Sequence, residues 1–420
     1  MKIELLYGKG KKEIELPDSV TVIRKKEMPF LEDGKAFEAV LKSLNEPLGA
    51  PPLFEIAKMK DSACVVVSDN TRPVPNKILL PPILEILERA GIKEIKIIVA
   101  TGLHHPLDEN GLKEILGEEI LGRYEIINHD ALDFENMTYL GETPVNGFPI
   151  YVNSHFLKSD LKILTGLIEP HFMAGYSGGR KSVCPGISSV ETVKYMHSPH
   201  ILESPYATNC IVDKNPFHIE ATHVAKKAGV DFIVNVVLNE AKKISAVFAG
   251  DLEFAFEKGV EYARKYSEAK IGKKFDLVIT TNAGYPLDRN YYQSVKGLVG
   301  ALNIIKEGGK IIIVTECSDG LGSENFRICL QKLKEFDSYD SYIEYISKME
   351  NFVIDQWEVE ELVKVLKKAE VYVYSDGLKE DDWEITFAKR IIDLQEQINN
   401  FLRNDIEVAV IPEGPYTIPF

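Results

Sequence analysis

The sequence predicts an α/β protein of two domains, each with a mainly parallel sheet flanked by helices. Short β-branched runs recur along the chain, and each leads through a turn-rich segment into a helical pattern. This alternation is typical of parallel sheets. The length of 420 residues allows two hydrophobic cores. A charged segment at residues 265–274 (KYSEAKIGKK) separates two series of these runs, so we expect domains at 1–268 and 269–420.

The chain opens on a hairpin pattern, because MKIELLYGKGKKEIELP alternates apolar and charged residues around Gly8-Lys9-Gly10. This favours a β-hairpin and argues against a secretion signal. Later runs predict strands at 63–67, 95–100, 161–164, 275–281, 310–315, 370–374 and 406–411. In parallel sheets, ligands bind beyond the carboxyl ends of the strands. We therefore expect the active site among the loops that follow these strands, in the cleft between the two domains.

Composition limits the class of protein. Apolar residues make up 45% of the chain and charged residues 27%, which is ordinary for a globular protein. The formal net charge of −15 argues against nonspecific nucleic-acid binding, but it is compatible with a local basic pocket for an anionic small molecule. No apolar run approaches the roughly 20 residues of a membrane span. The five cysteines are scattered and lack a CxxC pair, so we expect reduced thiols in the cytoplasm, without disulfides or a zinc site.

Chemically capable side chains gather on the loops predicted to follow strands. In chain order they are Asp69, Thr71, Arg72, Thr101, His104, His105, His171, Arg180 and Lys181, then His197, and finally Tyr291, Tyr292, Gln293 and Lys296 at the start of a helix. Each also has a plain structural interpretation. The SDNTRP stretch fits a capped turn, a loop histidine is often only solvated, and the tyrosine-rich stretch fits an amphipathic helix start. Taken singly, none of them identifies a site.

The stretch 171–182, HFMAGYSGGRKS, is similar to a phosphate-binding P-loop. Counted from Gly175, Lys181 and Ser182 are in place, but Arg180 stands where the loop needs a glycine. The backbone amides then cannot turn around a phosphate, which disfavours a nucleoside triphosphatase. The absence of GxGxxG after a strand likewise disfavours a dinucleotide-dependent oxidoreductase. Three glycines within five residues instead indicate a close backbone approach to something.

Together these loops resemble the nickel-pincer-dependent lactate racemases, part of a broader group of 2-hydroxyacid racemases and epimerases. The resemblance spans nearly the whole chain. It rests on Ser68–Pro73, Ala100–His104, Glu169–Ser182, His197, Asn215–His218, Tyr292–Lys296 and Asp355–Trp357. It implies an isomerase whose cofactor is nickel held by pyridinium-3,5-bisthiocarboxylic acid mononucleotide, the nickel-pincer nucleotide. It also implies cofactor-maturation proteins as partners.

The resemblance further implies a role for each matching residue. The implied cofactor-binding residues are Lys181, the covalent attachment point, and Asp69, Thr71, Arg72, Gly178 and Gly179. The implied nickel ligand is His197, and the implied catalytic bases are His104 and His171. The implied substrate-binding residues are Arg72, Tyr292, Gln293, Lys296 and Trp357. The implied chemistry is reversible hydride transfer from Cα, with one histidine base for each enantiomer. Histidine suits that role because its pKa lies near the working pH, and a square-planar site suits Ni(II).

The chain departs from the family pattern at one point. Where many members have His-Arg, this chain has His104-His105, and the missing cation bears on carboxylate or phosphate binding. The expected substrate is a small 2-hydroxyacid, most simply lactate. Two alternatives stay open: a racemase or epimerase of another 2-hydroxyacid with the same mechanism, and a homologue that binds the cofactor without turnover. The sequence leaves the oligomeric state open.

Overall fold

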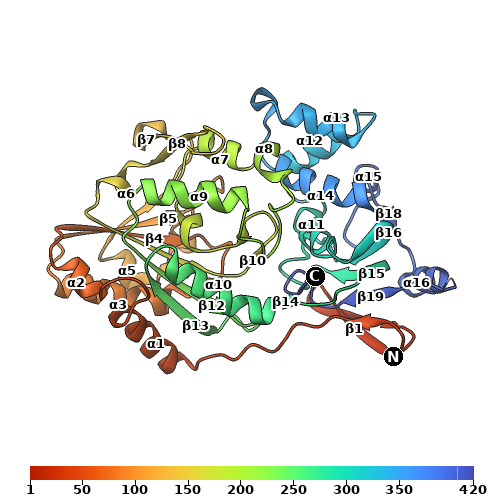
Figure 1. Cartoon of the computed structure of the whole chain (residues 1–420), viewed down its shortest axis with the longest axis horizontal. Helices are drawn as coiled ribbons and strands as arrows, with labels where there is room; N and C mark the ends of the chain where they lie inside the picture. Colours follow the sequence, from red (N-terminus) through yellow and green to blue (C-terminus); the bar gives the residue numbers. More distant parts are fainter. Residues whose placement is uncertain (404) are drawn as a thin grey trace. The chain divides into compact units, whose positions relative to one another are not determined.

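The computed structural model describes residues 1–403 and 405–420, and the chain divides into two compact units. The central unit comprises Glu27–Lys265, and the terminal unit comprises Met1–Lys26 together with Tyr266–Phe420 (Figure 1). Each unit has a six-stranded sheet flanked by helices, which confirms the predicted α/β class. Within the described part of the chain, no helix is long and apolar enough to cross a membrane.

The sheet of the central unit has the strand order β13-β12-β9-β4-β5-β6. Neighbouring strands are parallel except for β13, which pairs antiparallel with β12. The strands are β4 (Ser62–Ser68), β5 (Glu94–Ala100), β6 (Glu125–Asn128), β9 (Leu161–Leu167), β12 (Phe232–Leu238) and β13 (Ile244–Gly250). Because β9, β4 and β5 are adjacent and parallel, the loops that follow them start side by side at one edge of the sheet.

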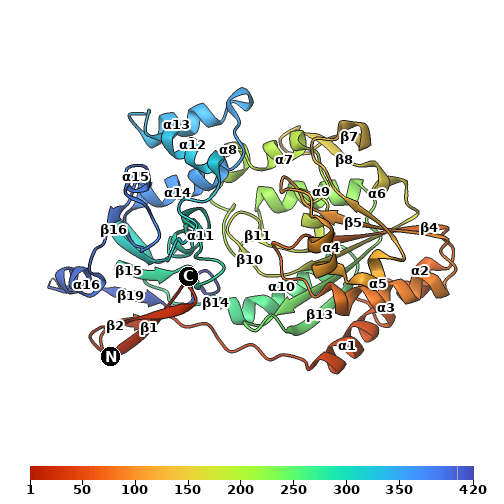
Figure 2. The same ribbon diagram turned by 180° about the vertical axis from the view of Figure 1, so that it is seen from behind.

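Helices cover both faces of this sheet (Figures 1 and 2). Val65 and Val67 of β4 join the core formed with α1 to α4, as the two-residue period of a strand requires. On the other face, α10 places Phe256 against Gly179. The helices are α1 (Asp33–Asn45), α2 (Leu53–Ala57), α3 (Asn76–Arg89), α4 (Glu109–Leu116), α5 (Glu118–Leu121), α6 (Ser154–Lys158), α7 (Val190–Met196), α8 (Pro199–Leu202), α9 (Pro216–Lys227) and α10 (Phe254–Ser267).

Short elements complete the central unit. Two antiparallel pairs, β7 (Met137–Glu142) with β8 (Pro149–Asn153) and β10 (Pro170–His171) with β11 (Gly175–Tyr176), lie outside the main sheet. A single 3₁₀ turn, η2 (Gly179–Ser182), follows β11 and carries Lys181. The stretch that is similar to a P-loop therefore folds as a tight β-pair followed by a 3₁₀ turn. A P-loop, in contrast, leads directly into an α-helix.

The sheet of the terminal unit has the order β18-β17-β16-β15-β19-β3 and is parallel throughout. Its strands are β3 (Thr21–Val22), β15 (Phe275–Thr281), β16 (Ile305–Val314), β17 (Ala369–Tyr374), β18 (Lys389–Arg390) and β19 (Val408–Ile411), with a small separate pair of β14 (Glu268–Ala269) and β20 (Ile418–Pro419). Its helices are α11 (Tyr291–Gly300), α12 (Glu324–Leu333), α13 (Tyr339–Ile346), α14 (Gln356–Lys368), α15 (Glu380–Trp383) and α16 (Leu394–Leu402). Helices α11 and α14 pack on each other and on the central strands of this sheet.

The first 26 residues belong to the terminal unit, whereas the sequence placed them in the first domain. The predicted hairpin is present as β1 (Lys2–Tyr7) and β2 (Gly10–Glu15), and Ile3 and Leu5 are buried in the core of the terminal unit. After the hairpin, β3 extends the terminal sheet by pairing with β19. This pairing joins opposite ends of the chain through two short strands, so no local pattern in the sequence predicts it. The chain passes from the terminal unit to the central unit after Lys26 and returns after Lys265.

Candidate active site

Asp69 and His104 form a hydrogen-bonded pair at the carboxyl edge of the central sheet, on the loops after β4 and β5. Asp69 is buried; its Oδ2 lies 2.6 Å from Nδ1 of His104, and its Oδ1 accepts from the Thr71 hydroxyl at 2.6 Å. Burial alone raises the pKa of Asp69, but the bonds from His104 and Thr71 and the charge of Arg72 lower it below its ordinary value. Because an ionised Asp69 only accepts, His104 donates from Nδ1 and keeps a lone pair on Nε2. The ring itself is exposed, and a neutral imidazole held by a carboxylate is an arrangement that general bases commonly use.

We expect Asp69→Asn to destabilise the protein in a pH-dependent way. The folded-state pKa of Asp69 lies below the unfolded value of about 3.9, so its stabilising contribution is present above that pH and is lost as the pH falls through the folded-state pKa. The free energy of unfolding should fall by roughly 1–3 kcal/mol at pH 7, and the difference from wild type should narrow below about pH 4. Urea denaturation across this pH range measures it, with Glu85→Gln at an exposed carboxylate as control. A pH-independent difference would contradict the ionised pair.

The stretch 171–182 closes around a buried arginine. Arg180 is 1% exposed, and its guanidinium donates to the carbonyl oxygens of Ala174 at 2.9 Å and Gly178 at 3.2 Å. The guanidinium also lies 4.3 Å from the ring centroid of Phe256, and burial lowers the pKa of Arg180 to about 9. A P-loop turns its amides towards a phosphate, whereas here two carbonyl groups turn towards a cation. Arg180 therefore stabilises the loop by donating hydrogen bonds to two of its carbonyl groups.

The glycines of this loop are required by contacts within the chain itself. Gly175, Gly178 and Gly179 have φ of 76°, 83° and 51°, conformations that side chains rarely adopt. A Cβ on Gly175 would overlap the carbonyl oxygen of Ile211, and one on Gly178 would lie 2.6 Å from Oδ1 of Asn235. The same Asn235 oxygen accepts the N–H of Gly179 at 2.7 Å. The close approach that the sequence predicted is thus made to protein atoms, while cofactor binding by Gly178 and Gly179 stays a prediction.

We expect Gly175→Ala to destabilise the protein by about 2–5 kcal/mol, because strain at positive φ adds to steric overlap. Gly34→Ala is the matched control. It introduces the same methyl group on α1, where no atom lies within 4 Å of the new Cβ, and it should stabilise by about 0.5–1 kcal/mol. Thermal and urea unfolding of both variants measure the difference. Equal stabilities would show that the loop relaxes freely.

Three predicted site residues meet at the ring of Phe217, in the first turn of α9. Lys181 Nζ lies 4.5 Å from the ring centroid, and the rings of His197 and His171 lie at centroid distances of 5.3 and 6.5 Å. Phe217 is completely buried, and its N–H donates to the capping side chain of Asn215 at 2.9 Å. Phe217 lies in the matching stretch Asn215–His218, but the sequence gives it no role of its own, because an apolar residue carries no chemical signature.

Lys181 and His197 occupy surroundings that disfavour positive charge. Burial, followed by the charges of Arg180 and Arg72, lowers the pKa of Lys181 well below its ordinary value. Burial and the nearby Lys181 lower the pKa of His197 to about 3. The Nδ1–H of His197 donates to the carbonyl oxygen of Val193 at 2.9 Å, so the neutral ring presents its Nε2 lone pair. An amine without its proton can act as a nucleophile, and an imidazole held by a backbone carbonyl is a typical metal ligand.

His171 is held in the opposite tautomer to His104. Its Nδ1 accepts the backbone N–H groups of Met173 at 3.2 Å and Ala174 at 3.3 Å, and its ring stacks on Phe172 at 5.2 Å. A neutral ring that accepts at Nδ1 carries its hydrogen on Nε2. The two histidines therefore present complementary Nε2 atoms, a lone pair on His104 and an N–H on His171.

Four further predicted residues lie together in the terminal unit, on the packed helices α11 and α14. Trp357 donates from Nε1 to the hydroxyl of Tyr292 at 3.1 Å, and Lys296 Nζ donates to Oε1 of Gln293 at 2.5 Å. Burial, together with nearby Glu358, raises the pKa of Tyr292 well above its ordinary value. Tyr292 is thus a neutral hydroxyl, and the group combines one cation with aromatic and amide side chains. Such a group suits a small anion that also carries a hydroxyl.

Arg72 lies on the loop after β4, about one-third exposed, with Nε 3.9 Å from Oε1 of Glu169. Across residues 1–403 and 405–420, no three His, Cys, Asp or Glu side chains come together as a metal site. A metal at His197 would therefore need its other ligands from a bound group.

Two family models match the chain. The model described as "Lactate racemase N-terminal domain" matches residues 7–209, and "Lactate racemase C-terminal domain" matches residues 271–418. A protein named lactate racemase from Thermoanaerobacterium thermosaccharolyticum is 36% identical over 419 residues, covering 98% of this chain and 97% of the relative. One from Lactiplantibacillus plantarum is 37% identical over 383 residues, covering 90% and 89%.

Solved structures agree with the sequence matches. The lactate racemase apoprotein from Thermoanaerobacterium thermosaccharolyticum is similar with a TM-score of 0.93 and 34% identity, covering 100% of both chains. A protein from Thermotoga maritima is similar with a TM-score of 0.68 and 20% identity, covering 94% of this chain and 99% of that one, which is a likeness of fold alone.

Proposed function

Because this chain belongs to the lactate racemase family, we propose that it is an isomerase that interconverts the enantiomers of a small 2-hydroxyacid, with lactate the first candidate. The meeting of His171, Lys181 and His197 at Phe217 carries the proposal. It supports a site in which a proton-transfer group, a nucleophilic amine and a metal-ligating imidazole act on one small volume.

The residues of the central unit fit a nickel-pincer nucleotide as cofactor. The Nε2 lone pair of His197 suits Ni(II) as the single protein ligand, and the neutral amine of Lys181 suits covalent attachment. Asp69, Thr71 and Arg72, on a neighbouring loop, are proposed to hold the nucleotide or orient its neighbours. When bound, this group supplies an acceptor for the Cα hydrogen of the substrate as hydride.

The two histidines are proposed to handle the hydroxyl proton. For one enantiomer, His104 takes it at Nε2, and the buried Asp69 stabilises the resulting imidazolium. The ketoacid then turns in the site, and His171, in its protonated form, returns a proton from the other side. For the opposite enantiomer the two roles exchange. The lone pair on Nε2 of His104 and the N–H on Nε2 of His171 support this division for the first direction.

The substrate carboxylate needs fixed cations. Arg72 in the central unit and Lys296 in the terminal unit are proposed for this role, because charge-assisted hydrogen bonds hold a carboxylate with defined geometry. Tyr292, Gln293 and Trp357 are proposed to complete the substrate-binding group around Lys296.

The test is racemisation by holo-protein made together with cofactor-maturation enzymes. Single enantiomers of lactate and other 2-hydroxyacids are incubated with it, and the loss of optical purity is followed by chiral chromatography. We expect racemisation of at least one acid by nickel-loaded protein and none by protein made without the maturation enzymes. A nickel-loaded protein that carries the nucleotide but racemises no acid of the panel would overturn the enzymatic assignment in favour of a cofactor-binding homologue.

A further inference from the structure

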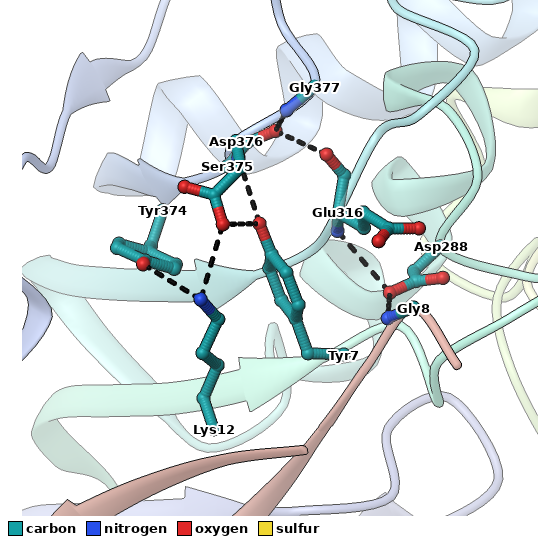
Figure 3. Close-up of polar contacts among 9 residues, drawn as sticks. All are labelled: Tyr7, Gly8, Lys12, Asp288, Glu316, Tyr374, Ser375, Asp376 and Gly377. Carbon is teal, nitrogen blue, oxygen red and sulfur yellow. Dashed lines mark hydrogen bonds and ion pairs between the residues drawn. The ribbon is translucent and has the colours of Figure 1, made fainter. Parts of the chain in front are cut away.

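The turn of the N-terminal hairpin closes on the loop that precedes α11 in the terminal unit. The N–H of Gly8 donates to Oδ2 of Asp288 at 2.6 Å (Figure 3). The carbonyl oxygen of Gly8 accepts the N–H of Tyr285 at 2.8 Å. These bonds join residues about 280 positions apart in the sequence. The hairpin turn is therefore hydrogen-bonded to Tyr285 and Asp288, in the segment 284–290 immediately before α11.

Asp288 links three segments through one buried side chain and its backbone. It is 0% exposed, and its Oδ2 accepts both from Gly8 and from the N–H of Glu316, the latter at 3.3 Å. Its carbonyl oxygen accepts the N–H of Cys317 at 2.8 Å. The other carboxylate oxygen is buried and finds no hydrogen-bond partner among the described residues. Leaving a buried carboxylate oxygen without a partner costs stability.

The segment that Asp288 holds also fixes the first turn of α11. Asn290, two residues after Asp288, caps this helix by accepting the N–H of Gln293 at 3.0 Å. The N–H groups of Tyr291 and Tyr292 donate to carbonyl oxygens of residues 320 and 321, each at 3.0 Å. These acceptors lie just beyond Glu316 and Cys317. The start of α11 is therefore held from both sides by segments that meet at Asp288.

We propose that Asp288 is a positioning residue for substrate binding: together with the Gly8 turn, it fixes the start of α11 and thus the places of Tyr292, Gln293 and Lys296. The proposal rests on the proposed function, because these three residues are the ones assigned to the 2-hydroxyacid. Asp288 itself touches no substrate. Its effect is on the binding of the acid, not on cofactor attachment in the central unit.

Gly8 is suited to this contact by its lack of a side chain. Its φ is 53°, and a Cβ at this position would overlap the carboxylate of Glu316. Alanine at this position is strained by the positive φ, whereas the end of the Glu316 side chain can move aside. Gly8→Ala therefore leaves Asp288 unchanged but strains the turn that bonds to it.

A second contact of the same hairpin provides the control. The hydroxyl of Tyr7 donates to Oδ2 of Asp376 and accepts the N–H of Asp376, each at 2.8 Å, and Lys12 donates to the same carboxylate at 3.2 Å (Figure 3). The Tyr7 hydroxyl bonds to Asp376 and not to Asp288 or α11, although residues 375 and 377 also bond to the carbonyl oxygen of Glu316. Tyr7→Phe removes the two bonds of Tyr7, keeps the pair of Lys12 with Asp376, and alters no bond made by Asp288 itself.

The test compares holo-protein carrying Asp288→Ala, Asp288→Asn, Gly8→Ala or Tyr7→Phe with wild type. For Asp288→Ala we expect the covalent adduct on Lys181 to be unchanged by intact mass, KM for the racemised acid to rise about tenfold or more, and kcat to change by less than about threefold. Asp288→Asn keeps an acceptor oxygen and should restore most of the affinity. Tyr7→Phe should leave KM unchanged. Hydrogen exchange at residues 291–293 should accelerate in Asp288→Ala and not in Tyr7→Phe.

Each outcome decides the proposal. An unchanged KM in a folded Asp288→Ala protein overturns it, as does a loss of the Lys181 adduct in that variant, since the effect is then not on substrate binding. If Asp288→Ala does not fold, Gly8→Ala takes its place, and an unchanged KM there has the same meaning. If wild-type protein carries the adduct but racemises no acid, the proposed function fails on its own. Exchange at residues 291–293 then decides whether Asp288 positions α11.

Discussion

Protein carrying Lys181→Ala, made together with the maturation enzymes, will have the mass of the bare polypeptide and no measurable racemase activity. Desolvation and the charges of Arg180 and Arg72 lower the pKa of Lys181, which favours the unprotonated amine, the form that acts as a nucleophile. Alanine offers no group to attach. Lys181→Arg keeps a positive charge but removes the nucleophile, because a guanidinium stays protonated. The Lys181→Arg protein should therefore also lack the adduct. Intact-mass spectrometry and nickel analysis of protein made with the maturation enzymes measure both.

The matched control for Lys181 is Lys226→Ala on α9 of the same unit. Lys226 is an exposed lysine paired with Glu253 at 2.5 Å, and surface pairs of this kind contribute little to stability. Its variant should carry the full adduct and retain activity. An adduct of unchanged mass in Lys181→Ala would refute the attachment point, and peptide mapping would then locate the true one.

His104→Ala and His171→Ala will each reduce racemisation by roughly 10²- to 10⁴-fold, the usual contribution of a general base. The sharper result concerns the direction of the reaction. In a single turnover, each variant should still oxidise one enantiomer to the ketoacid and fail with the other, and the enantiomer that reacts should differ between the two variants. The reason is that the proposed scheme gives each enantiomer its own base, so removing one histidine removes the proton acceptor for one enantiomer and leaves the acceptor for the other. Rapid-quench analysis of each enantiomer measures it.

The control for the histidine variants is His200→Ala, at an exposed histidine in the same unit. It removes an imidazole without touching the loops after β4, β5 or β9, and both enantiomers should react as in wild type. If His104→Ala and His171→Ala lose the same enantiomer, the two-base scheme is wrong. Full activity in either variant would remove that histidine from the chemistry altogether.

Local patterns in the sequence were enough to predict the fold class and many of the strands. The hairpin around Gly8 followed from alternating residues, and the strand at 275–281 followed from a β-branched run, because both patterns reflect burial over a few neighbouring residues. Strand β12 was not singled out, since its continuous apolar run, FIVNVVL, fits a buried helix segment equally well. The pairing of β3 with β19 was beyond any local pattern.

The candidate site shows the same limit. The sequence indicated that His171, Lys181 and His197 carry chemistry, because their residue types and motif are unusual. It could not indicate that they meet at Phe217, which requires α9 to fold back over the loop. The glycines were correctly taken as points of close approach. The atoms they approach, in Ile211 and Asn235, lie dozens of residues away and have no pattern that marks them.

The split of the terminal unit between the two ends of the chain sets an order of events during synthesis. Residues 1–26 leave the ribosome first, yet β3 has no sheet to join until β19, at residues 408–411, has been made. The central unit is one continuous segment and is complete once residue 265 has emerged, so it is able to fold first. Until β19 has been made, the nascent hairpin keeps apolar side chains such as Ile3 and Leu5 without their complete core. The folding of residues 1–26 therefore depends on a strand that is synthesised much later.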